Sequence, residues 1–554
     1  MKLNGAQILI EELLYHGVDE VFGYPGGTIL NIYDELYLNK DKIKLYTNAH
    51  EQHSAHAADG YARVTGKTGV VIATSGPGAT NLITGIATAF LDSVPMIAIT
   101  GNVATDLIGR DSFQEVDIVG ITMPITKHNY IVKKAEELQV TIREAFYVAN
   151  SGRPGPVLID IPKDVQKEIV EYDSKRKIIC SCNRVIPPSD INPAVEMLKK
   201  SKRPFIYSGG GVVISCATKE LLEFAERIDA PIATSLMGLS AIPYEHEKNL
   251  GMVGMHGKFA ASTALAECDL LIAIGTRFSD RATGNKKMFI KNCNVIHIDI
   301  DDAEVNKNIP VDSNILGDVK TVLSRICDKL PKLDNKQWLE HVLELKASPD
   351  NNLMLSDYEL NPKSIIETVS DCMPDDAIIA TDVGQHQMWT AQYYKFRLPR
   401  TFITSGGLGT MGFGMGAAVG ACISKGKSRT VLFTSDGSFH MNLNEMVTAV
   451  SYRLPITIIM LDNNTLGMVR QWQTMFFDKR YAETSLERKT DYVKLSEAFG
   501  AKGYRANNLA ELRQAVEDSK KIEGPTLIHC VIDSDENVFP MIPPNGTIKD
   551  IIIR

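Results

Sequence analysis

The sequence predicts an α/β protein of three domains built on mainly parallel sheets. The length of 554 residues accommodates three or four domains, and β-branched apolar runs alternate with helical stretches. One pattern also occurs twice: Thr74-Ser75 and Pro95 have the same spacing as Thr434-Ser435 and Pro455, and each proline opens an apolar strand. We therefore expect two domains of one fold, at residues 1–170 and 345–540.

Residues 189–335 predict a third, Rossmann-like domain between these two. RPFIYSGGGVV at 203–213 is typical of a strand, a glycine-rich turn and a helix, and the apolar runs in 268–280 and 294–301 indicate buried strands that end in polar residues. Gly209, Gly210 and Gly211 allow a ligand or another segment to approach the backbone closely, although they lack the GxGxxG register.

Two polar segments indicate linkers, and a short tail follows the last domain. The first linker, at 171–190, contains Pro187-Pro188, and the second, at 330–360, is rich in Lys, Asp and Asn. Residues 541–554 form the expected tail.

The composition indicates a globular cytoplasmic protein. Hydrophobic residues make up 44% and charged residues 23% of the chain, and the net charge of −8 gives no support for coating nucleic acid. The nine cysteines include no CxxC pair, and only Cys180 and Cys182 are close in sequence, so we expect reduced thiols. The N-terminus indicates an amphipathic helix without a leader, and no apolar run approaches the roughly 20 residues of a membrane span.

Asp436-Gly437 at the end of one apolar strand and Asn463-Asn464 at the end of the next predict a magnesium and diphosphate site. A strand-helix-strand unit brings both ends to one sheet edge, where carboxylate and carboxamide oxygens suit Mg²⁺. Gly437 and Ser438 would open a helix whose free N–H groups favour a diphosphate. An ordinary turn with an incidental Asp-Gly is the alternative for Asp436-Gly437 alone.

Several ordered motifs extend this interpretation over nearly the whole chain. The motifs are GYPGG (23–27), HEQ with AADGYAR (50–63), SGPGATN (75–81), SFQEVDIVGIT (112–122), SGRPGPVLIDIPKDV (151–165), GMHG (254–257), GQHQMW (384–389), TSGGLGTMGFG (404–414) and LGMVRQWQ (466–473). With these motifs the chain resembles the acetohydroxyacid synthase (acetolactate synthase) large-subunit family of thiamine diphosphate enzymes, whose three domains correspond to those predicted above.

The resemblance implies that Glu51 hydrogen-bonds the pyrimidine ring of thiamine diphosphate and promotes loss of the thiazolium proton. It also implies that Met411 holds the cofactor bent and that the Gly409 carbonyl accepts from the pyrimidine amino group. Further cofactor contacts are implied for Gln385, His386, Gly437, Ser438 and Met468, and Mg²⁺ ligands for Asp436, Asn463 and the backbone of Thr465.

The implied reaction joins two 2-keto acids in branched-chain amino-acid (valine, leucine, isoleucine) biosynthesis. Pyruvate loses CO₂, and its two-carbon unit adds to pyruvate or 2-ketobutyrate, whose retained carboxylate matches Arg281. Trp472 matches the residue that favours the larger acceptor. Further catalytic positions are implied for Gly27, Phe113, Gln114 and Lys163.

The resemblance is to the flavin-containing members, in which FAD performs no net redox step. Ser435, Asp462 and Ser279 depart from the family pattern, and Asp462 is expected to add negative charge near the metal, while Ser279 replaces a usual Asp. The residues that match the FAD site are Arg153, Gly209, Gly210, Gly211, Met255, His256, Gly275, Arg277, Asp299 and Asp318.

Further implications concern partners. The cofactor is expected to lie between Glu51 of one subunit and Asp436 of another, in a homodimer or a tetramer, with a small regulatory subunit as a possible partner. The alternatives are an FAD-independent catabolic acetolactate synthase, another carboligase of the superfamily, and a non-catalytic nucleotide-binding subunit, against which Glu51 argues. A metal site at His50, Glu51 and His53 is rejected, because HEQH does not have the HExxH spacing.

Overall fold

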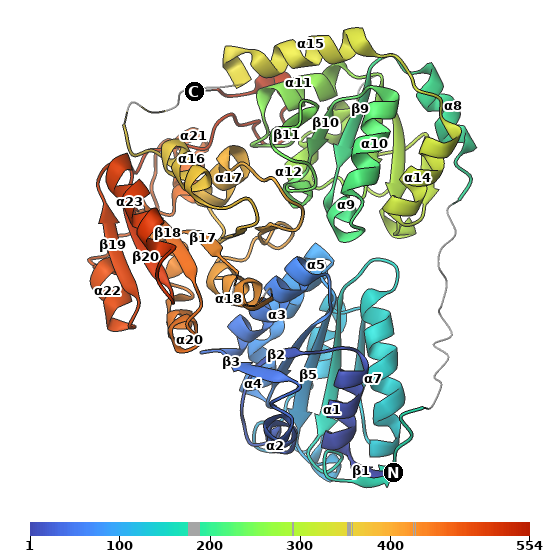
Figure 1. The fold of residues 1–554 in the computed structure, drawn as a ribbon, viewed down its shortest axis with the longest axis vertical. Coiled ribbons are helices and arrows are strands. Elements are labelled where there is room, and N and C mark those ends of the chain that lie inside the picture. The colour runs from blue at the N-terminus through green and yellow to red at the C-terminus, as the bar shows by residue number, and fades with distance from the viewer. Residues whose placement is uncertain are drawn as a thin grey trace.

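The computed structural model describes residues 1–175, 189–290, 293–351, 356, 358–424, 426 and 428–553. Three six-stranded parallel sheets, each covered by helices, make up the chain (Figure 1). This confirms the predicted α/β class, in which parallel strands are buried on both faces. The prolines at 187–188 and the cysteines at 180 and 182 lie outside the described residues.

The N-terminal sheet has the strand order β3-β2-β4-β5-β7-β6. A short antiparallel pair, β1 (Lys2–Asn4) with β8 (Ile169–Glu171), lies beside it. The strands of the six-stranded sheet are β2 (Glu20–Tyr24), β3 (Lys44–Thr47), β4 (Gly69–Ala73), β5 (Met96–Asn102), β6 (His128–Ile131) and β7 (Pro156–Pro162). Its helices are α1 (Gly5–Tyr15), α2 (Leu30–Leu38), α3 (Glu51–Thr65), α4 (Pro77–Asn81), α5 (Ile83–Asp92), η1 (Thr105–Leu107), α6 (Ile118–Thr122), η2 (Met123–Ile125) and α7 (Ala135–Asn150).

The C-terminal sheet has the order β16-β15-β17-β18-β20-β19. When strands are numbered in chain order within each sheet, both terminal sheets read second, first, third, fourth, sixth, fifth, and the repeated pattern falls on the third and fourth strands of each. The predicted common fold is therefore confirmed. The strands are β15 (Ile378–Thr381), β16 (Phe402–Ile403), β17 (Thr430–Ser435), β18 (Ile456–Asp462), β19 (Lys502–Ala506) and β20 (Thr526–Val531).

The helices of the C-terminal unit flank this sheet. They are α16 (Pro362–Cys372), α17 (Gln385–Tyr393), α18 (Gly414–Ser424), α19 (Asp436–Phe439), η6 (Leu443–Glu445), α20 (Met446–Ser451), α21 (Gly467–Phe476), α22 (Tyr492–Ala498) and α23 (Leu509–Ser519).

The central sheet has the order β11-β10-β9-β12-β13-β14, which is 3-2-1-4-5-6 in chain order. This is the strand order of dinucleotide-binding doubly wound sheets, so the Rossmann-like prediction is confirmed at the level of topology. The strands are β9 (Pro204–Ser208), β10 (Ile232–Thr234), β11 (Asn249–Met252), β12 (Leu270–Ile274), β13 (Asn294–Asp299) and β14 (Ser313–Leu316). The helices are α8 (Asn192–Lys200), α9 (Gly210–Ile214), α10 (Thr218–Ile228), η3 (Leu236–Gly238), α11 (Phe259–Glu267), α12 (Asp280–Thr283), α13 (Lys286–Phe289), η4 (Asp302–Glu304) and α14 (Val319–Lys329).

Helices α3 and α18 join the two terminal units within one chain (Figure 1). A Cβ atom on Gly60 of α3 would overlap the carbonyl oxygen of Ala417, and one on Gly420 of α18 would overlap that of Ala57. Glycine at these two positions therefore allows the helix backbones to pack directly against each other. This contact fixes α3, whose first residue is Glu51, against the C-terminal unit.

The structure corrects the predicted linker at 330–360. Helix α15 (Lys336–Ala347) occupies its middle, followed by η5 (Pro349–Asn351). Trp338, Leu339 and Val342 bury one face of α15, and the Trp338 indole N–H donates to the carbonyl of Pro204 at 2.9 Å. This narrow apolar face is hidden in sequence among Lys, Asp and Asn, which is why the segment resembled a linker.

The structure also corrects the single helix predicted after Asp436. It is broken into α19, η6 and α20, because Asn442 leaves the helical conformation at a φ of −142°. Its side chain instead donates to Asp382 at 2.8 Å. Helix α19 is a single turn, so its dipole is weak.

The C-terminal residues return to the central unit. The Ile542 N–H donates to the carbonyl of Met255, and Met541 pairs with Ile552 in an antiparallel bridge. The short helix η7 (Ile548–Asp550) lies in this segment. Helix η7 contacts α11 of the central unit.

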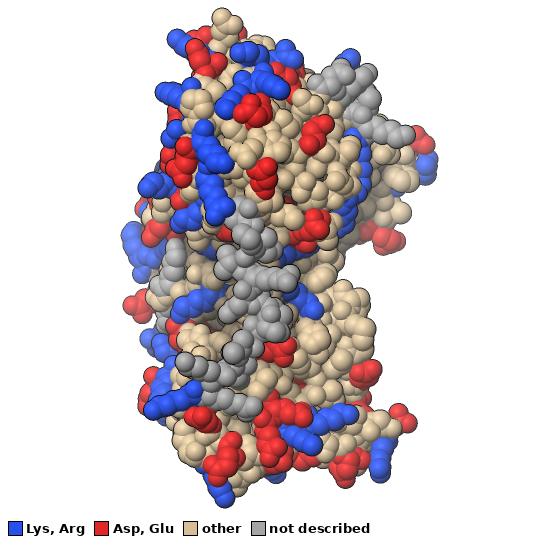
Figure 2. Space-filling model, turned by 90° about the vertical axis from the view of Figure 1, so that its right-hand side faces the viewer, with Lys and Arg blue, Asp and Glu red and all other residues tan. Residues whose placement is uncertain are grey.

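Charged side chains of both signs are intermixed over the face shown in Figure 2. This distribution accompanies the net negative charge of the sequence. Within the described part of the chain, no helix combines the length and the apolar character that crossing a bilayer requires.

Candidate active site

The predicted site residues of the N-terminal unit follow the carboxyl ends of its parallel strands. Gly27 comes after β2, Glu51 after β3 and Lys163 after β7, and Phe113 and Gln114 lie in the segment after β5. Because all strands of this sheet are parallel, these segments begin at one sheet edge. The carboxyl edge is where open α/β sheets bind ligands.

Glu51 is the first residue of α3 and is held from the neighbouring loop. The Asn81 side-chain N–H donates to its Oε2 at 2.9 Å, and His50, which precedes the helix as its N-cap, accepts from the Gln52 N–H through its ring. A Cβ atom on Gly78 would lie 3.3 Å from Glu51 Oε1, so glycine keeps space beside the carboxylate. Asn81 lies within the SGPGATN motif, but its contact with Glu51 was not predicted.

Three of the four other predicted catalytic residues of this unit are open to solvent in the single chain, and Gln114 is half-buried. Phe113 is 87% exposed, which is unusual for a large apolar ring, and Lys163 and Gly27 are also exposed. Gln114 has a φ of +58° and packs over Gly76. The structure places them on the same edge as Glu51 without bringing them into contact with it.

In the C-terminal unit, Asp436 is a buried carboxylate without a satisfactory partner. It is 1% exposed, and neither carboxylate oxygen accepts a hydrogen bond of good geometry from a described residue. Burial, reinforced by the charge of Asp462, raises its pKa to about 7, although the Gly437 N–H lies close enough to oppose this in part. A buried carboxylate of this kind fits a cation.

Asn463 lies at the end of β18, next to Asp436 at the end of β17. Its Oδ1 accepts from the Thr465 N–H at 3.3 Å, and its side-chain N–H donates to Gln385 at 3.2 Å. Gln385 in turn donates to Gln471 at 3.1 Å. The residues that follow β15 and β18 thus contact each other, and these two strands flank β17, which ends before Asp436.

Asp462 is turned away from this cluster. Its Oδ2 lies 2.7 Å from Nε2 of His529 on β20, and its Oδ1 accepts from the Asn464 N–H at 3.0 Å. The expected negative charge near the metal position is present only at a distance, where it contributes to the raised pKa of Asp436. Asp462 is therefore a structural neighbour, and the amide oxygen nearest this position in sequence is Asn463 Oδ1, which accepts only the long bond from the Thr465 N–H at 3.3 Å.

In the described part of the chain, carboxylates, histidines and cysteines do not by themselves form a metal site. Among the described residues, no group of three or more such side chains is placed to hold an ion. A metal bound at Asp436 would therefore depend on amide and backbone oxygens, as Asn463 and Thr465 provide.

The loop after β16 carries Gly409 and Met411 and is held by Asp382. The Gly412 N–H donates to Asp382 at 2.8 Å, and Gly412 has a φ of +86°, which glycine adopts readily. Ser438 is fully buried, and its hydroxyl oxygen lies 3.4 Å from the same N–H. Asp382 was not predicted, although its place at the end of the apolar strand β15 is a signal for it.

His386 and Met468 complete the predicted cofactor residues. Burial lowers the pKa of His386 to about 3, so the ring is neutral, and its Nε2 has no hydrogen-bond partner among the described residues. Met468 is partly buried against the core of the C-terminal unit. The orphaned Nε2 is a second buried polar atom available to a ligand.

The predicted flavin residues other than Arg153 follow or end strands at the carboxyl edge of the central sheet. The Gly209 N–H donates to Ile274 and the Gly211 N–H to Gly275, and a Cβ atom on Gly209 would overlap the Gly275 carbonyl. The glycine run therefore allows the turn that follows β9 to pack directly against the turn that follows β12. Gly210, Met255, His256, Asp299 and Asp318 also follow or end strands of this sheet.

Two guanidinium groups face this edge. Arg153 pairs with Glu304 at 3.0 Å and donates to Ser93 at 2.8 Å, so it joins the N-terminal and central units. Burial and the nearby positive charge of Arg153 lower the pKa of Arg277. Asp318 caps helix α14 through the Thr321 N–H at 3.1 Å.

Arg281 and Trp472, predicted as substrate residues, are brought together from two units. The guanidinium carbon of Arg281 lies 5.4 Å from the indole centroid, and one of its nitrogens lies 3.6 Å from the Met255 sulfur. The Arg281 side chain is 64% exposed. Its charge is thus available to an anion beside an apolar ring.

Glu51 and Asp436 have different surroundings in the single chain. Glu51 contacts Asn81 of the N-terminal unit, whereas the backbone of Asp436 contacts Arg488 at 3.1 Å and His440 at 2.7 Å. The acid and the candidate metal ligand each stand at the edge of their own sheet.

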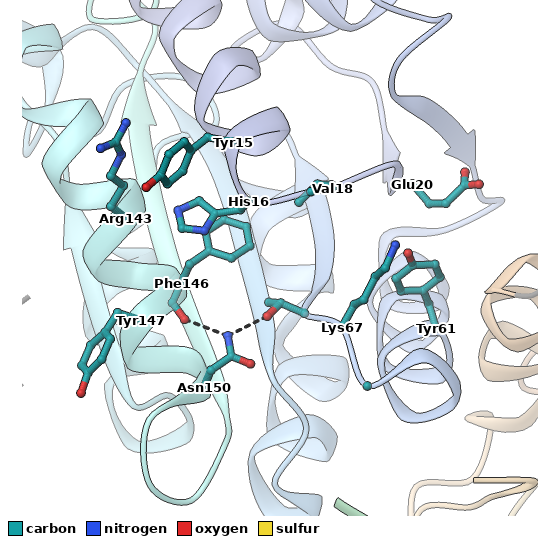
Figure 3. Close-up of a pocket in the computed structure, with 13 residues that line it drawn as sticks. Tyr15, His16, Val18, Glu20, Tyr61, Lys67, Arg143, Phe146, Tyr147 and Asn150 are labelled. Atoms are coloured by element: carbon teal, nitrogen blue, oxygen red, sulfur yellow. Dashed lines mark hydrogen bonds between the residues drawn. The ribbon is translucent and has the colours of Figure 1, made fainter. Parts of the chain in front are cut away.

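A cavity of about 480 Å³ lies elsewhere, at the amino ends of the N-terminal strands (Figure 3). It is lined by the end of α1, the start of β2, the turn after α3 and one side of α7. In it, Asn150 donates to Thr68 and to the carbonyl of Phe146, each at 2.8 Å, and His16 stacks on Phe146. Because the predicted site residues lie at the opposite edge, this cavity is separate from the candidate active site.

Three family profiles match the chain in order. They are "Thiamine pyrophosphate enzyme, N-terminal TPP binding domain" at residues 3–121, "Thiamine pyrophosphate enzyme, central domain" at 191–326 and "Thiamine pyrophosphate enzyme, C-terminal TPP binding domain" at 382–530. Each match falls on one of the three sheets.

Curated proteins with similar sequences carry a consistent name. A "Probable acetolactate synthase large subunit" of Methanocaldococcus jannaschii is 45% identical over 99% of this chain and 95% of its own length. "Acetolactate synthase isozyme 2 large subunit" of Escherichia coli is 44% identical over 99% of both chains. An "Acetolactate synthase large subunit" of Cyanidium caldarium is 45% identical over 98% of this chain and 95% of its own length.

Proposed function

The chain belongs to the acetolactate synthase large subunits within the thiamine pyrophosphate (thiamine diphosphate) enzymes, and from this membership we propose that it is the catalytic subunit of a biosynthetic acetolactate synthase. The observation that carries the proposal is that two sheets of the same topology carry different functional side chains at their carboxyl edges. One presents Glu51, and its sister presents Asp436 with Asn463.

The proposed reaction is a decarboxylation followed by carbon–carbon bond formation. One 2-keto acid loses its carboxylate as CO₂, and the electron pair left behind forms a bond to the carbonyl carbon of a second 2-keto acid, whose oxygen takes up a proton. Pyruvate would supply the two-carbon unit, and pyruvate or 2-ketobutyrate would accept it, as valine, leucine and isoleucine biosynthesis requires.

The residues present fit thiamine diphosphate with Mg²⁺. When bound, the cofactor supplies the carbon centre that stabilises the electron pair released on decarboxylation. Asp436, Asn463 and the Thr465 backbone would hold the metal, because the Asp436 carboxylate has no other satisfactory partner among the described residues. His386, with its unpartnered Nε2, and Gln385 would contact the diphosphate. Glu51, steadied by Asn81, would hold or transfer a proton at the pyrimidine ring.

The remaining cofactor contacts come from the loop after β16 and from the turn at Asp436. The Gly409 carbonyl and the Met411 side chain would orient the two rings, and Asp382 holds this loop through the Gly412 N–H. Ser438, Gly437 and Met468 would complete the contacts.

The central sheet edge fits FAD. Its strand order is that of dinucleotide-binding sheets, and Arg153 and Arg277 place two positive charges together beside the glycine turns. Ser279 leaves one side-chain contact fewer than an aspartate would offer. We include FAD in the proposal, in a non-redox role.

Arg281 and Trp472 would bind the acceptor. The guanidinium would pair with the retained carboxylate, and the indole beside it would contact the alkyl group of the acceptor. Gly27, Phe113, Gln114 and Lys163, which stand on the edge that carries Glu51, would approach the reacting carbonyl groups from the other subunit.

The proposal includes a homodimer or tetramer with active sites between subunits and a small regulatory subunit as partner. The exposed Phe113 and the separate surroundings of Glu51 and Asp436 support a site completed by a second chain. The name "large subunit" of the relatives supports a small partner.

The proposed function is tested with the purified chain, Mg²⁺, thiamine diphosphate, FAD and carbon-labelled pyruvate. We expect labelled CO₂ and acetolactate in equal amounts, and an added equimolar 2-ketobutyrate should divert the product to acetohydroxybutyrate. Omission of thiamine diphosphate is the control. A folded chain that binds the cofactor and forms neither product would contradict the proposal.

An FAD-independent catabolic enzyme is the second candidate. The colour of the supernatant after denaturation distinguishes the two, because released FAD is yellow. A colourless preparation with full activity that FAD does not increase would favour the catabolic enzyme.

A further inference from the structure

The C-terminal unit contacts the segment that leads into Glu51 and holds it in place. Only three residues, 48–50, connect β3 to α3, so any displacement of this connection moves the first turn of the helix. Tyr452 accepts from the Thr47 N–H at 2.9 Å, and its ring packs edge-on against Tyr46 with centroids 5.0 Å apart. These contacts come from residues some four hundred positions away, as the separation of 405 for the Thr47 bond shows.

Glu445 makes the buried hydrogen bonds of this contact between the C-terminal unit and the segment before Glu51. Its Oε1 accepts from the Asn48 side-chain N–H at 2.6 Å, and its Oε2 accepts from the Ala49 backbone N–H at 3.1 Å. Glu445 is fully buried and Asn48 is 1% exposed, so water does not substitute for either bond. A carboxylate offers the two acceptor oxygens that these two donors need.

The segment that carries Glu445 is itself anchored. Asn442, three residues earlier, donates to Asp382, and Asp382 also accepts from the Gly412 N–H at 2.8 Å. The carboxylate of Glu445 is therefore held at a fixed place relative to the sheet. Its two bonds transfer this rigidity to Asn48 and Ala49.

From this geometry we propose that Glu445 is a positioning residue that sets the direction of the Glu51 carboxylate through Asn48 and Ala49. The inference rests on the proposed function, in which Glu51 acts on the cofactor. A displacement of about 1 Å at a reacting group can cost about 100-fold in rate, and the Ala49 carbonyl is followed by only His50 before Glu51.

Two substitutions at Glu445 separate hydrogen bonding from size. Glu445→Met keeps the length of the side chain but removes both acceptors, and we expect kcat to fall about 10- to 100-fold with the pyruvate KM changed less than about threefold. Glu445→Gln can accept from the Ala49 N–H and donate to the Asn48 Oδ1, which has no other partner among the described residues. We therefore expect this variant to keep kcat within about threefold.

Tyr452→Phe is the matched control at the same contact. It removes the hydrogen bond to the Thr47 N–H, which lies at a more exposed position, and keeps the ring packing. We expect kcat within about twofold of the wild type. An equal loss in Tyr452→Phe and Glu445→Met would assign the effect to the domain contact in general and overturn the proposal.

Amide hydrogen exchange gives a readout that does not depend on the reaction. In the cofactor-free protein, we expect peptides that cover residues 47–52 to exchange at least about tenfold faster in Glu445→Met than in the wild type, with Glu445→Gln close to the wild type. Thermal unfolding and thiamine diphosphate titration verify that each variant is folded and binds. Unchanged exchange in Glu445→Met would overturn the proposal.

The failures of the two proposals are distinguishable. A wild type without carboligation would contradict the proposed function, whereas the exchange experiment would still report whether Glu445 holds the connection. An active wild type together with a fully active Glu445→Met would contradict only the positioning role.

Discussion

The Arg281 guanidinium lies over the Trp472 indole, with its central carbon 5.4 Å from the ring centroid. Arg281 belongs to α12 of the central unit and Trp472 to α21 of the C-terminal unit, so the contact joins two domains. Because the arginine side chain is 64% exposed, the pair retains a free face where an anion with a short alkyl group fits.

Substitution of Trp472 should weaken the preference for the larger acceptor that we propose for this residue. In Trp472→Leu, the flat surface beside Arg281 is lost, and we expect the acetohydroxybutyrate-to-acetolactate ratio at equal acceptor concentrations to fall roughly tenfold, which is the effect of about one methylene contact. Trp472→Phe keeps an aromatic ring, so the product ratio should fall less in this variant than in Trp472→Leu. Product quantification in a competition assay measures both, and an unchanged ratio in Trp472→Leu would exclude the indole as the selecting surface.

Substitution of Asp436 should stabilise the cofactor-free protein and abolish its binding of the metal. In the cofactor-free protein, Asp436→Asn removes a buried charge without a satisfactory partner, and we expect the free energy of unfolding to rise by about 1 to 3 kcal/mol. The variant should also lose the rise in Tm that Mg²⁺ with thiamine diphosphate gives the wild type.

Asp160→Asn provides the matched control for Asp436. Asp160 is also a buried carboxylate in a parallel sheet, but it accepts from Thr100 at 2.7 Å and from Asn102 at 2.6 Å. Its replacement should lower stability and leave the ligand-induced rise intact. A ligand-induced rise that persists in Asp436→Asn would remove Asp436 from the metal site.

The convergence of Asp436, Asn463 and Gln385 could be predicted from sequence because it follows from a local rule. Each residue ends or follows a parallel strand, and such ends meet at one edge. The sister sheet was predictable for the same reason, since the spacing of strand end and proline is repeated.

The contacts that orient these residues could not be predicted in the same way. Asn48 and Glu445 are 397 positions apart, and no local pattern records their pairing. The orientation of Asp462 depends on His529, which lies on the neighbouring strand β20, 67 positions further along the chain. Helix α15 was missed because its three buried side chains are surrounded by polar residues that dominate the composition.

Acid should destabilise the protein through His53. The residue is 3% exposed, and burial, aided by the charge of His50, lowers its pKa from 6.5 to about 4. The unfolded chain therefore binds a proton below pH 6.5 that the folded chain rejects until about pH 4, so stability present above pH 6.5 is lost as the pH falls through this range. The expected loss at pH 5 relative to pH 7 is about 2 kcal/mol.

His53→Gln isolates this contribution. Glutamine does not titrate and retains polar atoms for the neighbouring Asn444 side chain. Denaturant unfolding of both proteins at pH 7 and pH 5 should show that the pH-dependent loss is smaller in the variant by about 2 kcal/mol. Equal losses would show that folding does not lower the pKa of His53.

Glu51→Gln should abolish most turnover while the cofactor still binds. The amide keeps the size of the side chain and a possible contact with Asn81, but it cannot hold a proton for the pyrimidine ring. We expect kcat to fall about 100- to 10,000-fold, with the thiamine diphosphate Kd within about tenfold of the wild type. Steady-state kinetics and a fluorescence titration measure the two quantities, and full activity would exclude the proposed role of Glu51.

Hybrid dimers of Glu51→Gln and Asp436→Ala chains should recover activity that neither parent has. If each active site takes Glu51 from one chain and Asp436 from the other, one site of the hybrid combines both defects and the other contains neither. A hybrid purified through two different affinity tags should then have about half of the wild-type activity. If both residues served a site within one chain, each site of the hybrid would carry one defect and no activity would return. Absence of recovery in verified hybrids would therefore place the complete site in a single subunit.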